Sequence, residues 1–202
     1  LVAHIEGGEL SGTIDESIRH SISKLSHVHF VTSDKAKKRL VQLGENSINI
    51  HVIGSPDIDL MISKHLPSLN DSIKRYQLPF KNYSMLLYHP VTSEVDKLSF
   101  HVKEIVQAIN LSEENYIVIY PNNDSGSDLI INSFKKNFKT NSKIKIFPSL
   151  RFEHFLTLLK NSNFIIGNSS AGICEAPFYG IPTVNIGSRQ NNRSSNKQII
   201  NV

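Results

Sequence analysis

The sequence has a single cysteine, Cys174, and no tryptophan. One cysteine excludes an intramolecular disulfide and argues against a cysteine-based metal cluster, so we expect no metal site and a reducing, cytoplasmic setting. No apolar run approaches the ~18 residues of a membrane helix, and we expect neither a signal peptide nor a membrane segment. Disorder is excluded too, because 39% of the 202 residues are hydrophobic and the net charge is small.

Charge of one sign is only slightly in excess. The 22 Lys and Arg residues against 18 Asp and Glu residues give a net charge of +4, and the whole excess lies in residues 55–202, with 16 basic and 12 acidic side chains. Such an excess is typical of proteins that bind nucleic acid, a membrane surface or a small phosphorylated ligand, and composition alone does not choose among them. The basic run 35–39 lacks interleaved aromatic residues, so it indicates a solvated helix face rather than a nucleic-acid site.

Short runs rich in Val, Ile and Leu alternate with helical stretches, as is typical of parallel strands covered on both faces. The expected strands are Val2–Ile5, Val28–Thr32, Ile50–Ile53, Met85–Tyr88, Tyr116–Tyr120, Lys143–Phe147, Asn163–Ile166 and Thr183–Ile186. The expected helices are Asp15–His27, Asp34–Leu43, Leu98–Asn110, Asp128–Phe138, Phe152–Asn161 and Ala171–Tyr179. This alternation predicts an α/β fold with doubly wound parallel sheets.

The clearest boundary is Gly54-Ser55-Pro56, which follows an expected strand and combines two residue types that interrupt regular structure. It divides the chain into residues 1–54 and 55–202. The first part holds only about three strands, fewer than an independent sheet domain normally has. We therefore interpret residues 1–54 as the end of a first domain whose beginning is absent, and residues 55–202 as a second domain that lacks its C-terminal end.

The first candidate site lies in residues 4–20, HIEGGELSGTIDESIRH. An expected strand enters a glycine-containing loop that opens a helix, at the strand end where α/β folds bind ligands. Thr13 and Glu16 fit a capping box, which places Asp15 in the first helical turn. Glu6 and Asp15 are therefore candidates for a general acid and base.

Simpler roles compete for some of these side chains. Asp15 and Arg19 are four residues apart on one helix, and such a spacing is typical of a surface pair. His20 is more often packed or solvated than catalytic. Glu6 is harder to explain structurally, because a carboxylate between an apolar strand and two glycines has little structural use.

The second candidate site lies in residues 164–177, FIIGNSSAGICEAP. A buried strand ends in a turn of small residues that feeds a helix, with Ser169 or Ser170 as its cap. Free N–H groups at a helix start favour a phosphate, although an ordinary N-cap explains the same pattern. The segment is not a Walker loop, because it lacks the Gly-Lys-Ser/Thr ending. Glu175 lies one turn into the helix, where a carboxylate can bind a ribose diol.

Three further residues follow expected strands or lie in a polar loop. His89 comes directly after an apolar run and either hydrogen-bonds or protonates a departing phosphate, or is simply a satisfied polar residue. Asn122 belongs to a segment that is equally typical of a turn. Arg189 lies in a polar loop, where a phosphate contact and plain solvation both remain open.

Together these segments resemble the hydrolysing UDP-N-acetylglucosamine 2-epimerases, which include the bacterial sialic-acid pathway enzymes and the epimerase half of the animal bifunctional epimerase/kinase. The matching stretches run in order along nearly the whole chain: HIEGGELSGTIDESIRH (4–20), HPVTSE (89–94), PNNDSGS (121–127), GNSSAGICE (167–175) and GIPTVNIGSRQNNR (180–193). The non-hydrolysing enzymes have HVEAG in place of HIEGG and Pro-Glu-Glu in place of Ile14-Asp15-Glu16. The sequence therefore resembles the hydrolysing branch.

The resemblance implies two Rossmann-like domains arranged as in GT-B-like glycosyltransferases, with the N-terminal one only partly present. It implies conversion of UDP-N-acetylglucosamine and water to N-acetylmannosamine and UDP, with no cofactor and no metal, by a homo-oligomer (dimer or tetramer). The partners implied are the UDP-sugar and UDP, with no nucleic acid and no membrane. The family's chains are longer at both ends, so the resemblance does not extend to activity of this chain alone.

The resemblance also assigns roles to individual side chains. The catalytic set is Glu6, Asp15 and His89, and the set that binds substrate or UDP is Arg19, Asn122, Ser169, Ser170, Glu175 and Arg189. Three alternatives stay open: the same chemistry on a UDP- or GDP-linked 2,4-diacetamido-trideoxyhexose of the legionaminic acid route, a two-domain retaining glycosyltransferase, and a non-catalytic nucleotide-binding fragment.

Overall fold

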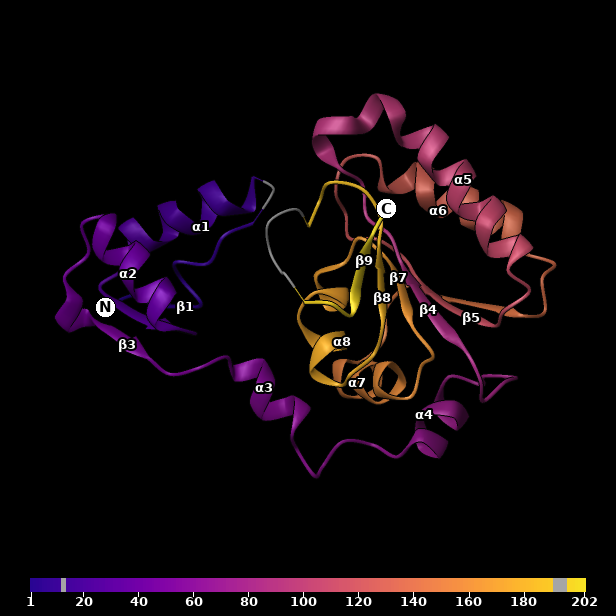
Figure 1. Ribbon diagram of the computed structural model, residues 1–202, viewed down its shortest axis with the longest axis horizontal. Helices are drawn as coiled ribbons and strands as arrows, with labels where there is room; N and C mark the ends of the chain where they lie inside the picture. Colours follow the sequence, from indigo (N-terminus) through magenta and orange to yellow (C-terminus); the bar gives the residue numbers. More distant parts are fainter. Residues whose placement is uncertain (12–13, 191–195) are drawn as a thin grey trace. The chain divides into compact units, whose positions relative to one another are not determined.

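The computed structural model describes residues 1–11, 14–190 and 196–202 and shows two compact units (Figure 1). Of the described residues, those up to Lys64 form the first unit, and residues 65–190 and 196–202 form the second. The units part ten residues after the predicted boundary at Gly54, because helix α3 (Pro56–Met61) belongs with the first unit. The assignment of residues 1–54 and 55–202 to two separate domains stays a prediction.

The first unit is built on a parallel sheet in the order β1-β2-β3. Its elements are β1 (Ala3–Ile5), α1 (Asp15–Lys24), β2 (Val28–Val31), α2 (Asp34–Gln42), the 3-10 helix η1 (Ser47–Asn49), β3 (Ile50–Val52) and α3. Right-handed crossovers between neighbouring parallel strands place α1 and α2 on one face of the sheet (Figure 1). The small core of this unit lies between the sheet and α2 and consists of Val31, Ala36, Leu40 and Ile50.

The second unit is a six-stranded parallel sheet in the order β6-β5-β4-β7-β8-β9. Its strands are β4 (Ser84–Leu87), β5 (Tyr116–Ile119), β6 (Ile144–Phe147), β7 (Ile165–Gly167), β8 (Thr183–Asn185) and β9 (Ile199–Asn201). Its helices are α4 (Leu69–Arg75), η2 (Thr92–Lys97), α5 (Leu98–Leu111), α6 (Ser127–Phe138), α7 (Phe152–Lys160), η3 (Ser170–Gly172) and α8 (Glu175–Phe178). Helices α5 and α6 cover one face of the sheet, and α7 and α8 the other (Figure 1).

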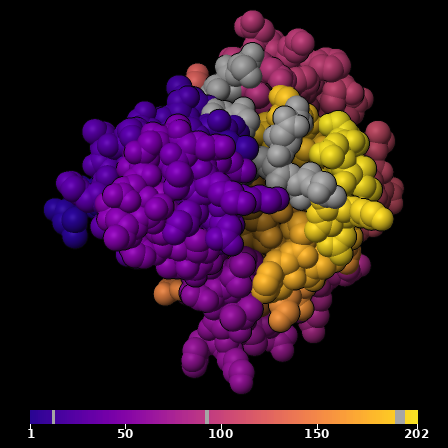
Figure 2. Space-filling model, turned by 60° about the vertical axis from the view of Figure 1, so that its left-hand side comes forward, coloured from indigo at the N-terminus to yellow at the C-terminus, as the bar shows by residue number. Residues whose placement is uncertain are grey.

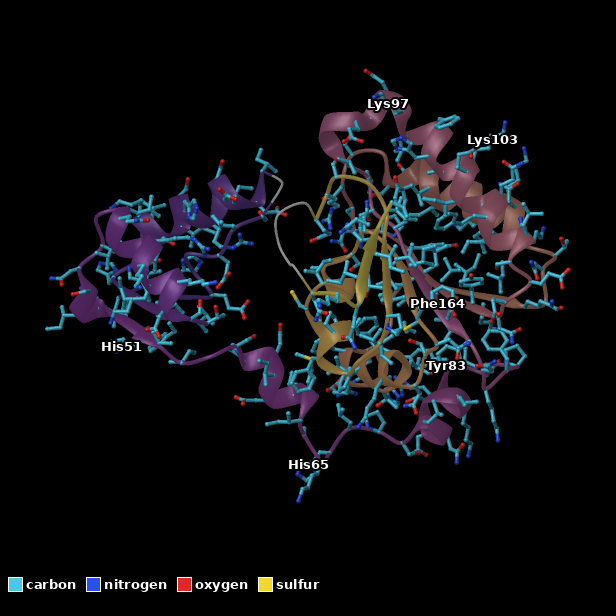
Figure 3. The ribbon with its side chains drawn as sticks, viewed as in Figure 1. His51, His65, Tyr83, Lys97, Lys103 and Phe164 are labelled. Atoms are coloured by element: carbon cyan, nitrogen blue, oxygen red, sulfur yellow. The ribbon has the colours of Figure 1, made fainter. Side chains whose placement is uncertain are left out.

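Burial in this unit follows the apolar pattern of the sequence. Every residue of β4 and β5 is buried, and α5 directs one stripe of side chains at helical spacing into the core, namely Leu98, Val102, Ile105, Val106 and Ile109. Lys97 and Lys103 project outward on the opposite side of this helical segment, as Figure 3 shows. Tyr83, also labelled in Figure 3, is fully buried and donates from its hydroxyl to the Leu158 carbonyl of α7 at 3.0 Å.

The eight expected strands lie within two residues of their predicted ends, and the predicted α/β class with parallel sheets is confirmed. Strand β9 and helices α3 and α4 were not expected. Strand β9 is a three-residue edge strand whose residues, yellow in Figure 2, lie at the surface, and Ile200 within it is exposed. Within the described part of the chain, no helix has both the length and the apolar character needed to cross a bilayer.

Gly167 allows β7 to lie close against β4 at the carboxyl end of the sheet. Its φ of +134° is in a region that side chains rarely adopt, and a Cβ there would lie 1.9 Å from the Leu87 carbonyl oxygen. Because that oxygen belongs to the rigid backbone of a buried strand, neither partner can move aside.

We expect Gly167→Ala to lower the free energy of unfolding by roughly 3 kcal/mol or more, since steric overlap adds to backbone strain. Gly187 is the matched control, because its φ is also positive at +73° but no atom lies within 4 Å of its missing Cβ. Gly187→Ala should cost only about 1 kcal/mol. Urea unfolding of the three proteins measures both effects, and equal losses for the two variants would contradict the steric explanation.

Candidate active site

The strand order of the second unit reverses between β4 and β7. In open α/β sheets, ligands bind outside the carboxyl ends of the strands at such a switch point. His89 follows β4, and Asn168, Ser169 and Ser170 follow β7. The topology thus brings two of the sequence-predicted segments to one edge.

Asn168 joins these two strand ends. Its side chain is fully buried, with Oδ1 accepting the His89 N–H at 2.7 Å and Nδ2 donating to the His89 carbonyl at 2.8 Å. Its own N–H donates to the Leu87 carbonyl at 3.0 Å. The side-chain amide therefore pairs with the His89 backbone as a neighbouring strand would, and it fixes His89 beyond the last ladder hydrogen bond.

His89 is held as a neutral hydrogen-bond donor. The Asn122 N–H donates to its Nδ1 at 3.3 Å, so the ring proton is assigned to Nε2. Burial, and next the positive charge of Arg189, lower the pKa of His89 to about 4. At neutral pH the Nε2–H group can thus donate a hydrogen bond to an anion, which favours hydrogen bonding over proton donation by a charged ring.

The loop after β8 closes this edge of the sheet. The Asn168 carbonyl accepts from Arg189 Nη1 at 3.1 Å and from Gln190 Nε2 at 2.8 Å. Arg189 is therefore held near His89 by a backbone contact, and its side chain is partly exposed. Asn168 and the buried Gln190 were missed as functional candidates, although both lie inside quoted motifs, because an amide in a turn carries no distinctive sequence signal.

The expected continuous helix 171–179 is wrong. Ser169 accepts the Ala171 N–H at 3.3 Å and begins a one-turn 3-10 helix, and a separate four-residue helix, α8, starts at Glu175. Such short helices have little macrodipole. A phosphate here would depend on the backbone N–H groups and hydroxyls of Ser169 and Ser170, not on a helix dipole.

A cavity of about 560 Å³ lies at the carboxyl ends of β4, β5 and β6. Its lining combines Asn122 with apolar side chains, including Pro148, Phe152 and Phe155. Asn122 was a candidate from the sequence, whereas the apolar residues of this lining were not expected there. A second cavity of about 400 Å³, beneath α5, is lined mainly by apolar groups and does not suit a charged ligand.

Glu6 lies directly after β1 in the first unit. Its φ is +62°, a left-handed conformation that is uncommon for a residue with a side chain. Its N–H donates to the Phe30 carbonyl at 2.8 Å, and its Oε1 accepts from the Ser55 hydroxyl at 3.0 Å. The carboxylate is partly exposed, at the carboxyl edge of the sheet.

Asp15 and Arg19 lie on the helix that follows. Asp15 is exposed and begins α1, as expected. Thr13, the expected capping residue, lies outside the described residues, and Glu16 accepts the Ser11 N–H at 2.9 Å. Arg19 Nη1 donates to the Glu9 carbonyl at 3.1 Å, so in this structure it supports the loop, and its role in substrate binding stays a prediction.

The basic run 35–39 was expected to be a solvated helix face, but two of its side chains donate hydrogen bonds to backbone carbonyls. Arg39 Nη1 donates to the Gly8 carbonyl at 2.9 Å, and Lys37 Nζ donates to the Ile50 carbonyl at 2.9 Å. Gly8 has a φ of +77°, and a Cβ there would lie 2.5 Å from the Ala36 carbonyl oxygen of α2. The loop carrying Glu6 is thus packed directly against this helix.

The family model for UDP-N-acetylglucosamine 2-epimerase matches residues 1–202. The chain belongs to the UDP-N-acetylglucosamine 2-epimerase family. A protein of this name from Neisseria meningitidis serogroup B is 52% identical over 200 residues, which cover 99% of this chain and 52% of that relative. A UDP-N,N'-diacetylbacillosamine 2-epimerase (hydrolyzing) from Legionella pneumophila is 37% identical and is covered to 53%.

Solved structures of the epimerase family share the fold. The UDP-N-acetylglucosamine 2-epimerase of Methanocaldococcus jannaschii, in complex with UDP-GlcNAc and UDP, matches 99% of this chain and 57% of its own, with a TM-score of 0.75 and 21% identity. A different UDP-GlcNAc 2-epimerase from Neisseria meningitidis, bound to UDP-GlcNAc, gives a TM-score of 0.67 at 16% identity, covering 95% of this chain and 54% of that one. The chain therefore spans about half the length of the epimerases it matches.

The neutral state of His89 predicts a pH dependence of stability. The unfolded chain titrates a histidine near pH 6.5, so between pH 6.5 and 4 it binds more protons than the folded chain. We expect the free energy of unfolding to fall by about 3 kcal/mol from His89 as the pH drops through this window. Ring ¹⁵N NMR would report the titration directly, and His89→Gln should remove this part of the dependence. A His89 ring that titrates near pH 6.5 would contradict the prediction.

Proposed function

We propose that the full-length product of the gene encoding this chain is a hydrolysing 2-epimerase that converts UDP-N-acetylglucosamine and water to N-acetylmannosamine and UDP. The observation that carries the proposal is the switch-point edge, where a neutral buried His89, an anchored Arg189 and the turn 168–170 come together. The 52% identical relative is named a UDP-N-acetylglucosamine 2-epimerase, which supports this substrate. The single cysteine fits a reducing compartment, so the proposal places the reaction in the cytoplasm.

The nucleotide would occupy the second unit. Ser169 and Ser170 would bind the diphosphate with backbone N–H groups and hydroxyls, and Arg189 would balance its charge. Glu175 would accept hydrogen bonds from the ribose hydroxyls. The uracil ring of the nucleotide would enter the 560 Å³ cavity, where Phe152 offers an aromatic surface beside polar groups such as Asn122.

His89 would assist departure of the diphosphate. Negative charge develops on the oxygen that leaves C1, and a donor aimed at that oxygen stabilises the transition state more than the ground state. The Nε2–H of a neutral His89 is such a donor, since its Nδ1 is occupied by the Asn122 N–H. The charge of Arg189 would contribute without any proton transfer.

Glu6 and Asp15 would supply the acid–base chemistry. One carboxylate takes the proton from C2, the C–H electron pair becomes the C1=C2 bond, and the C1–O bond breaks with its electrons leaving on UDP. Water then adds to C1 of the 2-acetamidoglucal while C2 receives a proton on the opposite face. Two groups are needed because removal and return occur on different faces.

A second candidate substrate has specific support. The Legionella pneumophila relative and a Campylobacter jejuni relative, 36% identical, carry names that specify UDP- or GDP-linked N,N'-diacetylbacillosamine and hydrolysis. The same elimination and hydration apply to that sugar, because its C1 and C2 carry the same kinds of substituent as C1 and C2 of UDP-N-acetylglucosamine. The names of these relatives also favour hydrolysis over simple epimerisation.

We expect the full-length protein to release UDP and N-acetylmannosamine from UDP-N-acetylglucosamine, with solvent deuterium at C2 of the sugar. Glu6→Gln should abolish turnover while UDP affinity stays nearly unchanged, because the amide cannot accept the proton. Mass spectrometry of the products from each nucleotide sugar in D₂O measures turnover and deuterium incorporation, and titration calorimetry measures the UDP affinity of the Glu6→Gln protein. Absence of deuterium at C2, together with transfer of the sugar to an acceptor, would identify a glycosyltransferase instead.

UDP alone should bind the second unit, and Glu175→Ala should weaken that binding about 10-fold or more, because a hydrogen bond to a charged group is lost. Titration calorimetry with this chain measures the affinity. Glu114, an exposed carboxylate just before β5, is the matched control and should leave affinity unchanged when replaced by Ala. Equal affinities for wild type and Glu175→Ala would contradict the ribose assignment.

A further inference from the structure

We propose that Ser55 is the positioning residue for Glu6, and that its hydroxyl fixes Oε1 so that Oε2 is the oxygen that exchanges the C2 proton. The proposal rests on the function proposed for Glu6. In the sequence, Ser55 only marked a boundary. The structure gives it a direct contact with the candidate base, at 3.0 Å between Oγ and Oε1.

The contact crosses the carboxyl edge of the first sheet. Glu6 follows β1 and Ser55 follows β3, with β2 between them in the strand order. Neighbouring strands are about 4.8 Å apart, so the contact between Glu6 and Ser55 links chain segments that follow two strands separated by β2. The left-handed backbone of Glu6 redirects the chain directly after β1 and belongs to this arrangement.

Ser55 forgoes the usual structural role of a serine at its position. It is the N-cap residue of α3, where a serine hydroxyl normally accepts a backbone N–H of the first turn, yet its side chain makes no capping hydrogen bond. Pro56 follows at the first helical position and holds Ser55 in an extended conformation, with a ψ of 125°. The Ser55 backbone is thus restrained by Pro56, and its hydroxyl donates a hydrogen bond to Glu6 instead of capping α3.

The Glu6 backbone is held independently of Ser55. Its N–H bonds to Phe30, and the following loop is fastened by Arg39 to the Gly8 carbonyl and by Arg19 to the Glu9 carbonyl. The Thr32 hydroxyl also donates to the Glu9 carboxylate. Loss of the Ser55 hydroxyl therefore frees the Glu6 side chain without releasing the loop.

A carboxylate with one oxygen fixed has one oxygen left to react. The Ser55 hydroxyl donates to Oε1, and among the described residues Oε2 has no hydrogen-bond partner. Rotation about the side-chain bonds would otherwise exchange the two oxygens and spread the base over many orientations. Restriction to one orientation places the lone pairs of Oε2 in a constant direction for proton transfer.

The test compares Ser55→Ala, Ser55→Thr and Ser68→Ala in the full-length protein. We expect Ser55→Ala to lower kcat about 10- to 100-fold with KM nearly unchanged, and Ser55→Thr to restore kcat because it keeps the hydroxyl. Ser68 is the matched control, since it is the N-cap of α4 and does accept a backbone N–H, from Asp71 at 3.1 Å. Ser68→Ala should lower the urea midpoint and leave kcat unchanged, the reverse of Ser55→Ala.

A second measurement needs no turnover. In this chain labelled with ¹³C at the Glu carboxyl carbons, Ser55→Ala should shift the Glu6 Cδ resonance, whereas Ser55→Thr and Ser68→Ala should not. An unshifted resonance, or a Ser55→Ala protein with normal kcat, overturns the positioning role. If the wild-type protein turns over no nucleotide sugar while the resonance shifts as expected, the proposed function fails and the contact itself stands.

Discussion

The close approach of β7 to β4 at their carboxyl ends is the constraint on which the second unit depends. Gly167 permits it, because any Cβ would collide with the Leu87 carbonyl. Asn168 can then pair with the His89 backbone through both atoms of its amide while its carbonyl receives two side-chain donors. A buried amide with every polar group satisfied is costly to disturb, so this pairing holds His89 and Arg189 in place together.

The first unit reaches a comparable rigidity by other means. Its sheet is small, and the loop after β1 has no long strand pairing to hold it. Cationic side chains on the two helices donate instead to loop carbonyls, from Arg19 and Arg39. A left-handed Glu6 is sustained because its N–H, its carboxylate and the following peptides are each fixed by a different element. Strain at Glu6 is thereby confined to a residue that the proposed chemistry uses.

The sequence allowed the layered fold to be predicted, because parallel strands and amphipathic helices leave periodic apolar patterns. It did not reveal α3, α4 or β9, which are too short for a period to show, or the break before Glu175, where backbone geometry rather than composition divides the helix. Most candidate side chains were visible as polar residues at strand ends. The contacts of Asn168, Arg39 and Ser55 were not, because each is a hydrogen bond between segments far apart in the sequence. The sequence pattern Ser-Pro does not indicate whether the serine hydroxyl caps a helix or hydrogen-bonds to a carboxylate.

The two units differ in the charge they bring to the proposed reaction. A carboxylate must be ionised to act as a base, whereas a diphosphate is stabilised by neutral or cationic donors, and a cation close to a carboxylate makes that carboxylate a weaker base. In this chain Glu6 and Asp15 belong to the first unit, and Arg189 with the neutral His89 belongs to the second. The basic excess of the chain lies in residues 55–202, most of which belong to the second unit. Burial keeps His89 uncharged, so among the described residues the proposed diphosphate site combines the guanidinium of Arg189 with neutral hydrogen-bond donors.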